Sequence, residues 1–237
     1  MNAIRYMAGL SLVEIDSEYE QLAQLAASAN AAQNTLTHKF EKLPNISEED
    51  YENALKGAQS SNLAKGQESL PLAILRLNRD SVSKNTNVDS LTHRRWILNP
   101  AMKKTGFGIA QKVYAQYAGD ISNENIFSDT KIVCWPPKNM PLEYATKDDP
   151  YSVFLTDDFE FDSEVSVSMV RSGDGGTWNF TAAQSDGYFR YAEGGNNVHT
   201  KYIAWKPDNI TDYMVNDIVE IIINGVKKDG KDYPIKY

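Results

Sequence analysis

The sequence predicts two domains, an α+β layered domain followed by an antiparallel β-sandwich. Helical patterns fill most of the first hundred residues, short runs of β-branched and aromatic residues follow them, and helical periodicity is missing after Tyr151. A chain of 237 residues suits one large domain or two modest ones. We therefore expect the first domain to cover residues 1–142 and the second to cover residues 143–237.

Four helices are expected in the first domain. They lie over residues 16–34, after Ser47, near residues 70–79 and near residues 90–98. Ser17 and Glu20 have the spacing of a capping box, and apolar residues then recur at helical intervals. Three acidic residues after Ser47 complement the dipole of the second helix, and Pro100 stops the fourth helix.

After Pro100 the pattern changes from helices to strands. Three runs rich in β-branched and aromatic residues are expected to form one sheet of the first domain, namely residues 105–110, 112–117 and 131–135. A linker over residues 138–150, which carries two prolines and several charges, then leads to the second domain.

The second domain is expected to consist of short strands. These are residues 151–156, 164–171, 177–180, 201–205 and 218–224. Val165, Val167 and Met169 alternate with serines, as expected when one face of a strand is buried. The run Gly-Asp-Gly-Gly at 173–176 is a turn signal. This pattern predicts an antiparallel β-sandwich of immunoglobulin-like size.

The composition narrows the possible functions. The net charge is -8, and it resides in the second domain, because residues 1–142 hold 15 basic and 15 acidic residues while residues 143–237 hold 9 and 17. An acidic chain without a basic stripe argues against nucleic-acid binding.

No stretch approaches the roughly 18 apolar residues of a membrane span. The single Cys134 excludes an intrachain disulfide, and the opening residues lack the pattern of a signal peptide.

Two of the three histidines lie in the first domain, His38 in LTHKF and His93 in SLTHRRWILNP. Neutral imidazole is a good ligand for Zn²⁺, but a catalytic zinc normally has three protein ligands and a water. The spacing alone favours polar residues at helix ends over a metal site. His199 lies in a polar stretch and is assigned no role.

Two further combinations of residues have both a functional and a structural explanation. A triad of Ser61, His93 and Asp80 is conceivable, although Ser61 sits in no G-x-S-x-G elbow. An acidic run could chelate Ca²⁺ through oxygen ligands, but it lacks the glycine and spacing of an EF-hand, so a solvated turn is favoured. This run consists of Asp157, Asp158, Glu160, Asp162 and Glu164.

The first half of the chain resembles the bacterial branch of the CAP superfamily, the group of cysteine-rich secretory proteins, antigen 5 and plant PR-1. The motifs that carry the resemblance are LTHKF, SSNLAKG at 60–66, HRRWILNP at 93–100 and TGFG at 105–108. The resemblance extends over roughly residues 1–137. The later VCWPP and SGDGGTWNF are similar to the β-sandwich appended to such domains in clostridial-type secreted proteins.

The resemblance implies a three-layer α-β-α sandwich with a cleft that holds two histidines and two acidic residues, a tetrad that binds zinc or another divalent ion in some members. His38 and His93 match the two histidines. Where the family has Glu-Asn, this sequence has Ser61 and Asn62, and Asp80 is a stand-in for the second glutamate. We therefore expect these five residues to line a ligand cleft, with the two histidines as its metal ligands.

These expectations favour a secreted or cell-surface binding protein whose cleft takes a small ligand, peptide or glycan. The alternative is a metal-dependent hydrolase that acts on peptide or cell-wall material through His38, His93 and Asp80. A third interpretation assigns recognition to the β-sandwich and a structural role to the first domain.

Overall fold

The computed structural model describes residues 1–81, 86–124, 131–194 and 199–237. The chain divides into two compact units, which are described one at a time. The first consists of Met1–Tyr6, Leu10–Arg79 and Thr92–Asp129, and the second of Met7–Gly9, Asp80–Leu91 and Thr130–Tyr237. The boundary expected between residues 142 and 143 stays a prediction. Among the described helices, none has both the length and the apolar character needed to cross a membrane.

The helices of the first unit follow the local signals of the sequence. They are α1 (Asn2–Met7), α2 (Ser17–Ala32), α3 (Glu48–Gln59), α4 (Leu70–Arg79) and α5 (Thr92–Ile97). The side chain of Asp16 caps α2 by accepting the backbone N–H groups of Glu18 and Tyr19, so the expected cap at Ser17 was wrong by one residue. Ser47 caps α3 as its sequence predicts.

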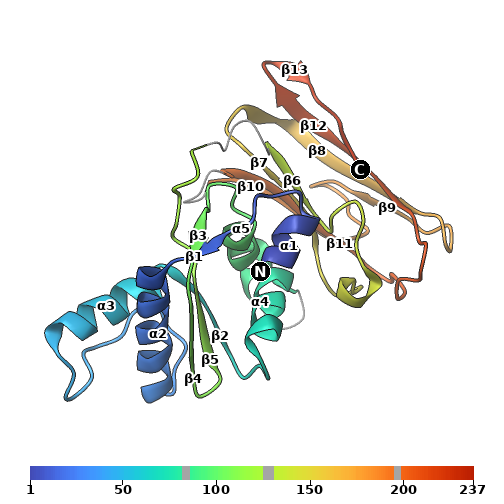
Figure 1. Cartoon of the computed structure of the whole chain (residues 1–237). Coiled ribbons are helices and arrows are strands. Elements are labelled where there is room, and N and C mark those ends of the chain that lie inside the picture. Colours follow the sequence, from blue (N-terminus) through green and yellow to red (C-terminus); the bar gives the residue numbers. More distant parts are fainter. Residues whose placement is uncertain (82–85, 125–130, 195–198) are drawn as a thin grey trace. The chain divides into compact units, whose positions relative to one another are not determined.

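A three-stranded antiparallel sheet forms the middle of the first unit. Its order is β2 (Ser61–Lys65), β5 (Val113–Tyr117) and β4 (Phe107–Ala110). All five residues of β5 are buried, because α2 with α3 covers one face of the sheet and α4 the other (Figure 1). The expected strand over residues 105–110 is divided in two, and its first part, β3 (Lys104–Thr105), pairs in parallel with β1 (Glu14–Ile15).

Two glycines allow α2 to lie against this sheet. A Cβ atom on Gly106 would come within 2.2 Å of backbone atoms of Tyr19 and Glu20, and one on Gly108 within 2.2 Å of the Ala23 carbonyl oxygen. Real Cβ atoms do not approach backbone this closely, so the contact between helix and strand requires glycine at both positions.

The second unit consists mainly of two antiparallel sheets that share one hydrophobic core. The first sheet has the order β10 (Gly187–Glu193), β11 (Lys201–Pro207), β7 (Tyr151–Leu155) and β6 (Ile132–Trp135). The second has the order β13 (Lys231–Asp232), β12 (Val219–Lys228), β8 (Phe159–Arg171) and β9 (Thr177–Phe180), with β14 (Ile235–Lys236) also on β12. The α+β class is therefore confirmed, while the immunoglobulin-like topology stays a prediction.

One strand was assigned to the wrong sheet. Residues 131–135 were expected in the sheet of the first domain, but β6 pairs with β7, where Val133 lies opposite Phe154. The choice between sheets is a long-range one that local β-propensity does not decide. The expected linker over residues 138–150 lies within the second unit and contains the short 3-10 helix η2 (Leu142–Tyr144).

A short segment from the middle of the chain also belongs to the second unit. It contains the 3-10 helix η1 (Thr86–Asp89). The hydroxyl of Tyr188 on β10 donates to the carboxylate of Asp89 at 3.0 Å, and Tyr202 on β11 donates to its carbonyl oxygen. The first sheet of this unit therefore holds η1 through tyrosine hydroxyls.

Candidate functional site

A buried pair of amides lies on the α4-covered face of the sheet in the first unit. Asn62 on β2 and Gln116 on β5 are direct cross-strand partners, and Asn62 Nδ2 donates to Gln116 Oε1 at 2.9 Å. Gln116 Nε2 donates in turn to the Thr105 hydroxyl at 3.1 Å and to the Tyr117 carbonyl oxygen at 2.5 Å. Because buried amides need partners, this network fixes both side chains.

The same network holds His93. Asn62 Nδ2 donates to the main-chain carbonyl oxygen of His93 at 3.3 Å, so the start of α5 is tied to β2. The His93 residue is half-buried. Its neighbour Arg94 is fully buried and donates to the carbonyl oxygens of Asn78 and Arg79 at 2.7 and 2.6 Å, which caps the end of α4.

A second buried arginine holds the end of α5. Arg5 donates to the carbonyl oxygens of Ser11, Ile97, Asn99 and Met102 at distances of 2.8–3.2 Å. Burial lowers the pKa of this guanidinium to about 10, so Arg5 stays charged at neutral pH. The helix that carries His93 is thus held by hydrogen bonds on both sides.

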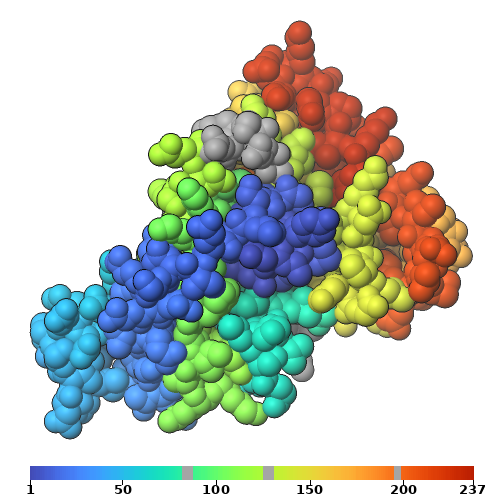
Figure 2. All heavy atoms as spheres, in the orientation of Figure 1, coloured from blue at the N-terminus to red at the C-terminus, as the bar shows by residue number. Residues whose placement is uncertain are grey.

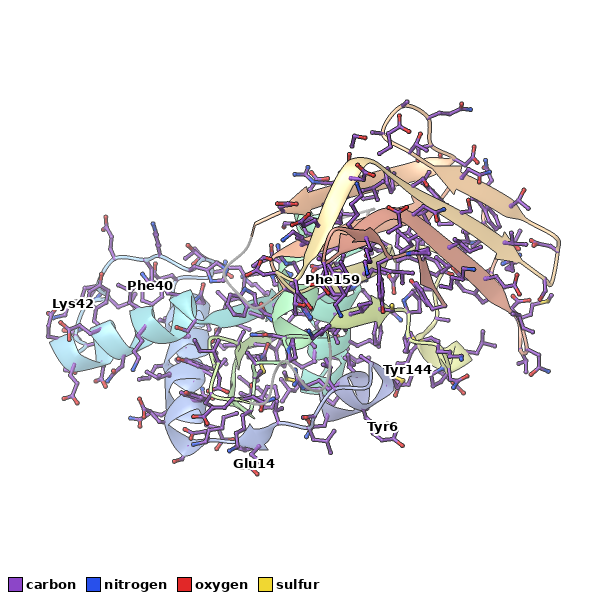
Figure 3. The ribbon with its side chains drawn as sticks, turned by 90° about the horizontal axis from the view of Figure 1, so that it is seen from above. Tyr6, Glu14, Phe40, Lys42, Tyr144 and Phe159 are labelled. Carbon is purple, nitrogen blue, oxygen red and sulfur yellow. The ribbon has the colours of Figure 1, made fainter. Side chains whose placement is uncertain are left out.

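His38 lies in the segment between α2 and α3, where Figure 3 labels Phe40 and Lys42. Phe40 packs against the core around α2, and the hydroxyl of Tyr51 on α3 donates to its carbonyl oxygen at 3.2 Å. The Thr37 N–H donates to Asn30 Oδ1 at 2.7 Å. These contacts fix the segment on both sides of His38.

The hydrogen bond of His38 determines its neutral tautomer. His38 Nδ1 lies 2.7 Å from the carbonyl oxygen of Ala58, and since a carbonyl oxygen only accepts, Nδ1 carries the proton. In the neutral ring Nε2 is therefore the nitrogen with the lone pair. The residue is exposed, so Nε2 is suited to accept a hydrogen bond from a ligand or to bind a metal ion.

Ser61 and Asn62 point to opposite faces of the sheet, because successive side chains of a strand alternate. Ser61 lies opposite Tyr117 and on the side of Leu63, which belongs to the core around α2. Its hydroxyl is buried and has no hydrogen-bond partner among the described residues. A serine without a hydrogen bond to a base is not activated, so the triad of Ser61, His93 and Asp80 is not assembled.

The remaining candidates lie in the second unit. Asp80 is fully buried and has a positive φ of 42° directly after α4. His199 is also fully buried and stacks on Phe154 at 5.9 Å between ring centroids, so it is a buried aromatic residue in a loop. In the acidic run, Asp158 pairs with Lys131 at 2.7 Å. Glu160, Asp162 and Glu164 lie on β8, so the expected solvated turn was wrong for these three residues.

No group of three His, Cys, Asp or Glu side chains that could hold a metal ion lies in the described parts of the chain. A catalytic zinc normally takes three protein ligands. The described residues therefore do not fit a complete catalytic metal site, and binding of an ion by His38 and His93 stays a prediction.

The motifs of the sequence do not identify Gln116, which orients Asn62, or Thr105, which holds Gln116. The available signal was the glutamine at the centre of the apolar strand VYAQY. A polar residue at the middle of a strand that is buried on both faces must have a side-chain partner, but the partner depends on strand register.

The model of the cysteine-rich secretory protein family, CAP, matches residues 1–127, which is more than half of the chain. The chain belongs to the CAP family. No curated protein and no solved structure matches it. The matched CAP region contains the amide network, His38 and His93.

The single cysteine, Cys134 on β6, lies outside the matched region. Burial raises the pKa of its thiol to about 12, so the thiol is protonated at neutral pH.

Proposed function

We propose that this CAP protein is a secreted or cell-surface binding protein of the bacterial extracellular branch, whose CAP domain binds a small ligand, peptide or glycan beside His38 and His93. Membership of a family of generally extracellular, ligand-binding proteins supports this assignment. The observation that carries it is the exposed His38 ring, whose Nδ1 is fixed on a main-chain carbonyl oxygen while Nε2 is left to accept from a ligand.

The two histidines are fixed by neighbouring parts of one segment. His38 is bonded to Ala58 and the His93 carbonyl to Asn62, and these two anchors are four residues apart in the sequence. Four residues of extended chain span at most about 14 Å. The Cα atoms of the two anchor residues therefore lie within this distance of each other, which supports a shared binding site.

Binding is favoured over hydrolysis by the chemistry of position 61. A glutamate at this position, as in the family pattern, would supply an anionic ligand or a general base. The hydroxyl of Ser61 supplies neither, and it lies on the other face of the sheet from Asn62. We assign the β-sheet unit a role as spacer or adhesion module.

The test uses soluble muropeptides released from peptidoglycan, because they carry both a glycan and a peptide. Binding to the wild type is measured by isothermal titration calorimetry, and the muropeptides are analysed by mass spectrometry after incubation. We expect binding without cleavage, and at least tenfold weaker binding by His38→Ala. The matched control is Lys39→Ala, which changes the exposed neighbouring side chain and leaves the ring of His38 in place.

Equal binding by His38→Ala, or no binding to the wild type, would contradict the proposal. Cleavage that depends on added Zn²⁺ and is lost in His38→Ala would replace it with the hydrolase alternative. A titration with Zn²⁺ alone separates the two candidate functions. The hydrolase requires tight Zn²⁺ binding that depends on His38, whereas the binding protein does not.

A further inference from the structure

The second unit contains a groove that the CAP-domain proposal does not use. Its volume is about 640 Å³, within the usual range of ligand pockets. One wall is the segment from Pro136 to Thr146, which includes η2, and the other is the loop from Tyr213 to Ile218 before β12. In Figure 2 the yellow-green segment that carries η2 stands beside the orange and red surface of the later strands, and Figure 3 labels Tyr144 on this turn.

Both walls expose large apolar side chains to solvent. Met214, Val215 and Ile218 on one wall are 61%, 74% and 61% exposed, and on the other wall Leu142 and Tyr144 are 39% and 37% exposed. These five are most of the exposed large apolar side chains described in the second unit. Such a concentration is typical of interaction sites, whereas single exposed apolar residues need no explanation.

The interior of the groove is aromatic and rigid. The lining residue Trp135 is 2% exposed and Tyr151 is 4% exposed. The hydroxyl of Tyr151 lies 2.8 Å from the hydroxyl of Tyr213, and the Tyr151 ring stacks on Trp205. The groove therefore has a preformed interior between two walls that end in exposed apolar side chains.

The charges of the lining are mainly negative. Asp149, Asp217 and Glu220 oppose the single Lys138. Arg171 lies 4.0 Å from Asp217, but its guanidinium is already paired with Asp174. Burial raises the pKa of the Tyr213 hydroxyl, while the hydrogen bond with Tyr151 and the positive charge of Arg171 lower it and the charges of Asp149 and Asp217 raise it. With 9 basic and 17 acidic residues over residues 143–237, the whole region favours a positively charged ligand.

We infer that this groove binds an extended apolar peptide segment of a partner protein that carries a lysine or arginine. In an extended peptide successive side chains point to opposite sides. Consecutive apolar residues would therefore contact the Met214 wall and the Leu142 wall in alternation. The basic residue would meet the exposed Glu220, and the largely buried Asp149 and Asp217 would add to the negative potential. A small amine would satisfy the charge but leave most of the apolar walls exposed.

The probe is a fluorescein-labelled, end-capped heptapeptide of leucine and valine with one central lysine, titrated with the full-length protein and followed by fluorescence anisotropy. Two further peptides carry glutamate or norleucine in place of the lysine. We expect the lysine peptide to bind at least fivefold more tightly than the glutamate peptide, with the norleucine peptide between them. Added salt should reduce this difference.

Two variants test the walls and the charge separately. The double variant Val215→Ser/Ile218→Ser should weaken binding of the lysine peptide at least tenfold, while Ile109→Ser/Ile121→Ser, which removes two exposed isoleucines of the first unit, should not. Lys138→Glu removes the basic residue from the lining and should tighten binding at least threefold. Because misfolding would weaken binding, the tighter binding expected of Lys138→Glu cannot result from loss of the fold.

Absence of binding by all three peptides, equal binding of the lysine and glutamate peptides, or unchanged binding by Val215→Ser/Ile218→Ser would each overturn the inference. Sedimentation of the wild type at increasing concentration tests a different occupant. Dimers that Val215→Ser/Ile218→Ser abolishes would assign the groove to a second copy of this chain and would also overturn it. The muropeptide test concerns His38, so either proposal can fail without the other.

Discussion

Asn62 and Gln116 face each other across β2 and β5, and the side-chain nitrogen of Asn62 donates a 2.9 Å hydrogen bond to the side-chain oxygen of Gln116. Both residues are almost wholly buried, at 3% and 0% exposure. The same Asn62 nitrogen reaches the carbonyl oxygen of His93, so one amide links the two strands to α5. The position of His93 in the CAP domain therefore depends on the register of the sheet.

Asn62→Ala should lower the free energy of unfolding by about 1–3 kcal/mol, because it leaves a buried acceptor on Gln116 without its donor. Urea denaturation at neutral pH measures the change. The double variant with Gln116→Ala should cost less than the sum of the single variants, with a coupling energy of about 0.5–3 kcal/mol. Additive effects would mean that the two amides do not stabilise each other.

Arg5→Met should destabilise the CAP domain by more than about 3 kcal/mol, because it orphans several buried carbonyl groups that each cost about 1–3 kcal/mol. Arg5→Lys keeps the charge but supplies fewer donors in a different geometry, so we expect an intermediate loss. Thermal unfolding followed by circular dichroism measures both. The control is Arg76→Met on the exposed face of α4, which should stay within about 0.5 kcal/mol of the wild type.

The sequence predicted those elements whose signals are local. Helix α4 has the expected bounds, and α3 begins after Ser47, because capping and 3.6-residue periodicity act within a few residues. Strand β9 also has its expected bounds. Strand β2 was missed, since SNLAK is short and lacks β-branched residues. It becomes a strand through pairing with β5, which is distant in the chain.

The candidate site was predicted only in its residue types. His38, His93 and Asn62 were identified from motifs, but the partners that orient them were not. Which face a side chain occupies depends on register, and a shift by one residue would exchange Ser61 and Asn62 between the two faces. The groove of the second unit was missed for a similar reason, because its walls come from segments about 70 residues apart in the chain.

Gly106→Ala and Gly108→Ala should each lower the free energy of unfolding by about 1–3 kcal/mol, because the added methyl group forces α2 away from the sheet. The control is Gly119→Ala, whose Cβ would meet Ser60 at 3.3 Å and which has no positive φ. Chemical denaturation of the three variants gives the comparison. Equal stability of all three would mean that the helix shifts without loss of packing.

Asp174→Asn should make thermal stability less dependent on acid. The hydrogen bond from Arg171, together with the N–H of Gly176, lowers the pKa of this carboxyl to about 2 from its usual 3.8. Between these values the unfolded chain binds more protons than the folded chain, so the stabilisation is present above about pH 4 and is lost as the pH falls toward 2. Other carboxylates with lowered pKa values act in the same direction, so the variant should lose only part of the pH dependence of stability.

The measurement for Asp174→Asn is the melting temperature at a series of pH values from 7 down to about 2, spanning the usual and folded-state pKa values. Between about pH 4 and about pH 2, the melting temperature of the wild type should fall further than that of Asp174→Asn. Asp229→Asn, an exposed position in the turn between β12 and β13, is the control and should keep the wild-type slope. A variant slope equal to that of the wild type would refute the role of the Arg171 pair.

Asn78→Leu on α4 should raise the free energy of unfolding by about 1 kcal/mol, since both amide atoms of this fully buried side chain lack a partner among the described residues. Asn30→Leu on α2 is its matched opposite. Asn30 is equally buried, but its amide donates to Ala26 and accepts from Thr37, so the substitution should cost about 1–3 kcal/mol. Urea denaturation of both variants measures the two changes in the free energy of unfolding. A loss of stability in Asn78→Leu would contradict the expectation that removal of an unpaired buried amide is favourable.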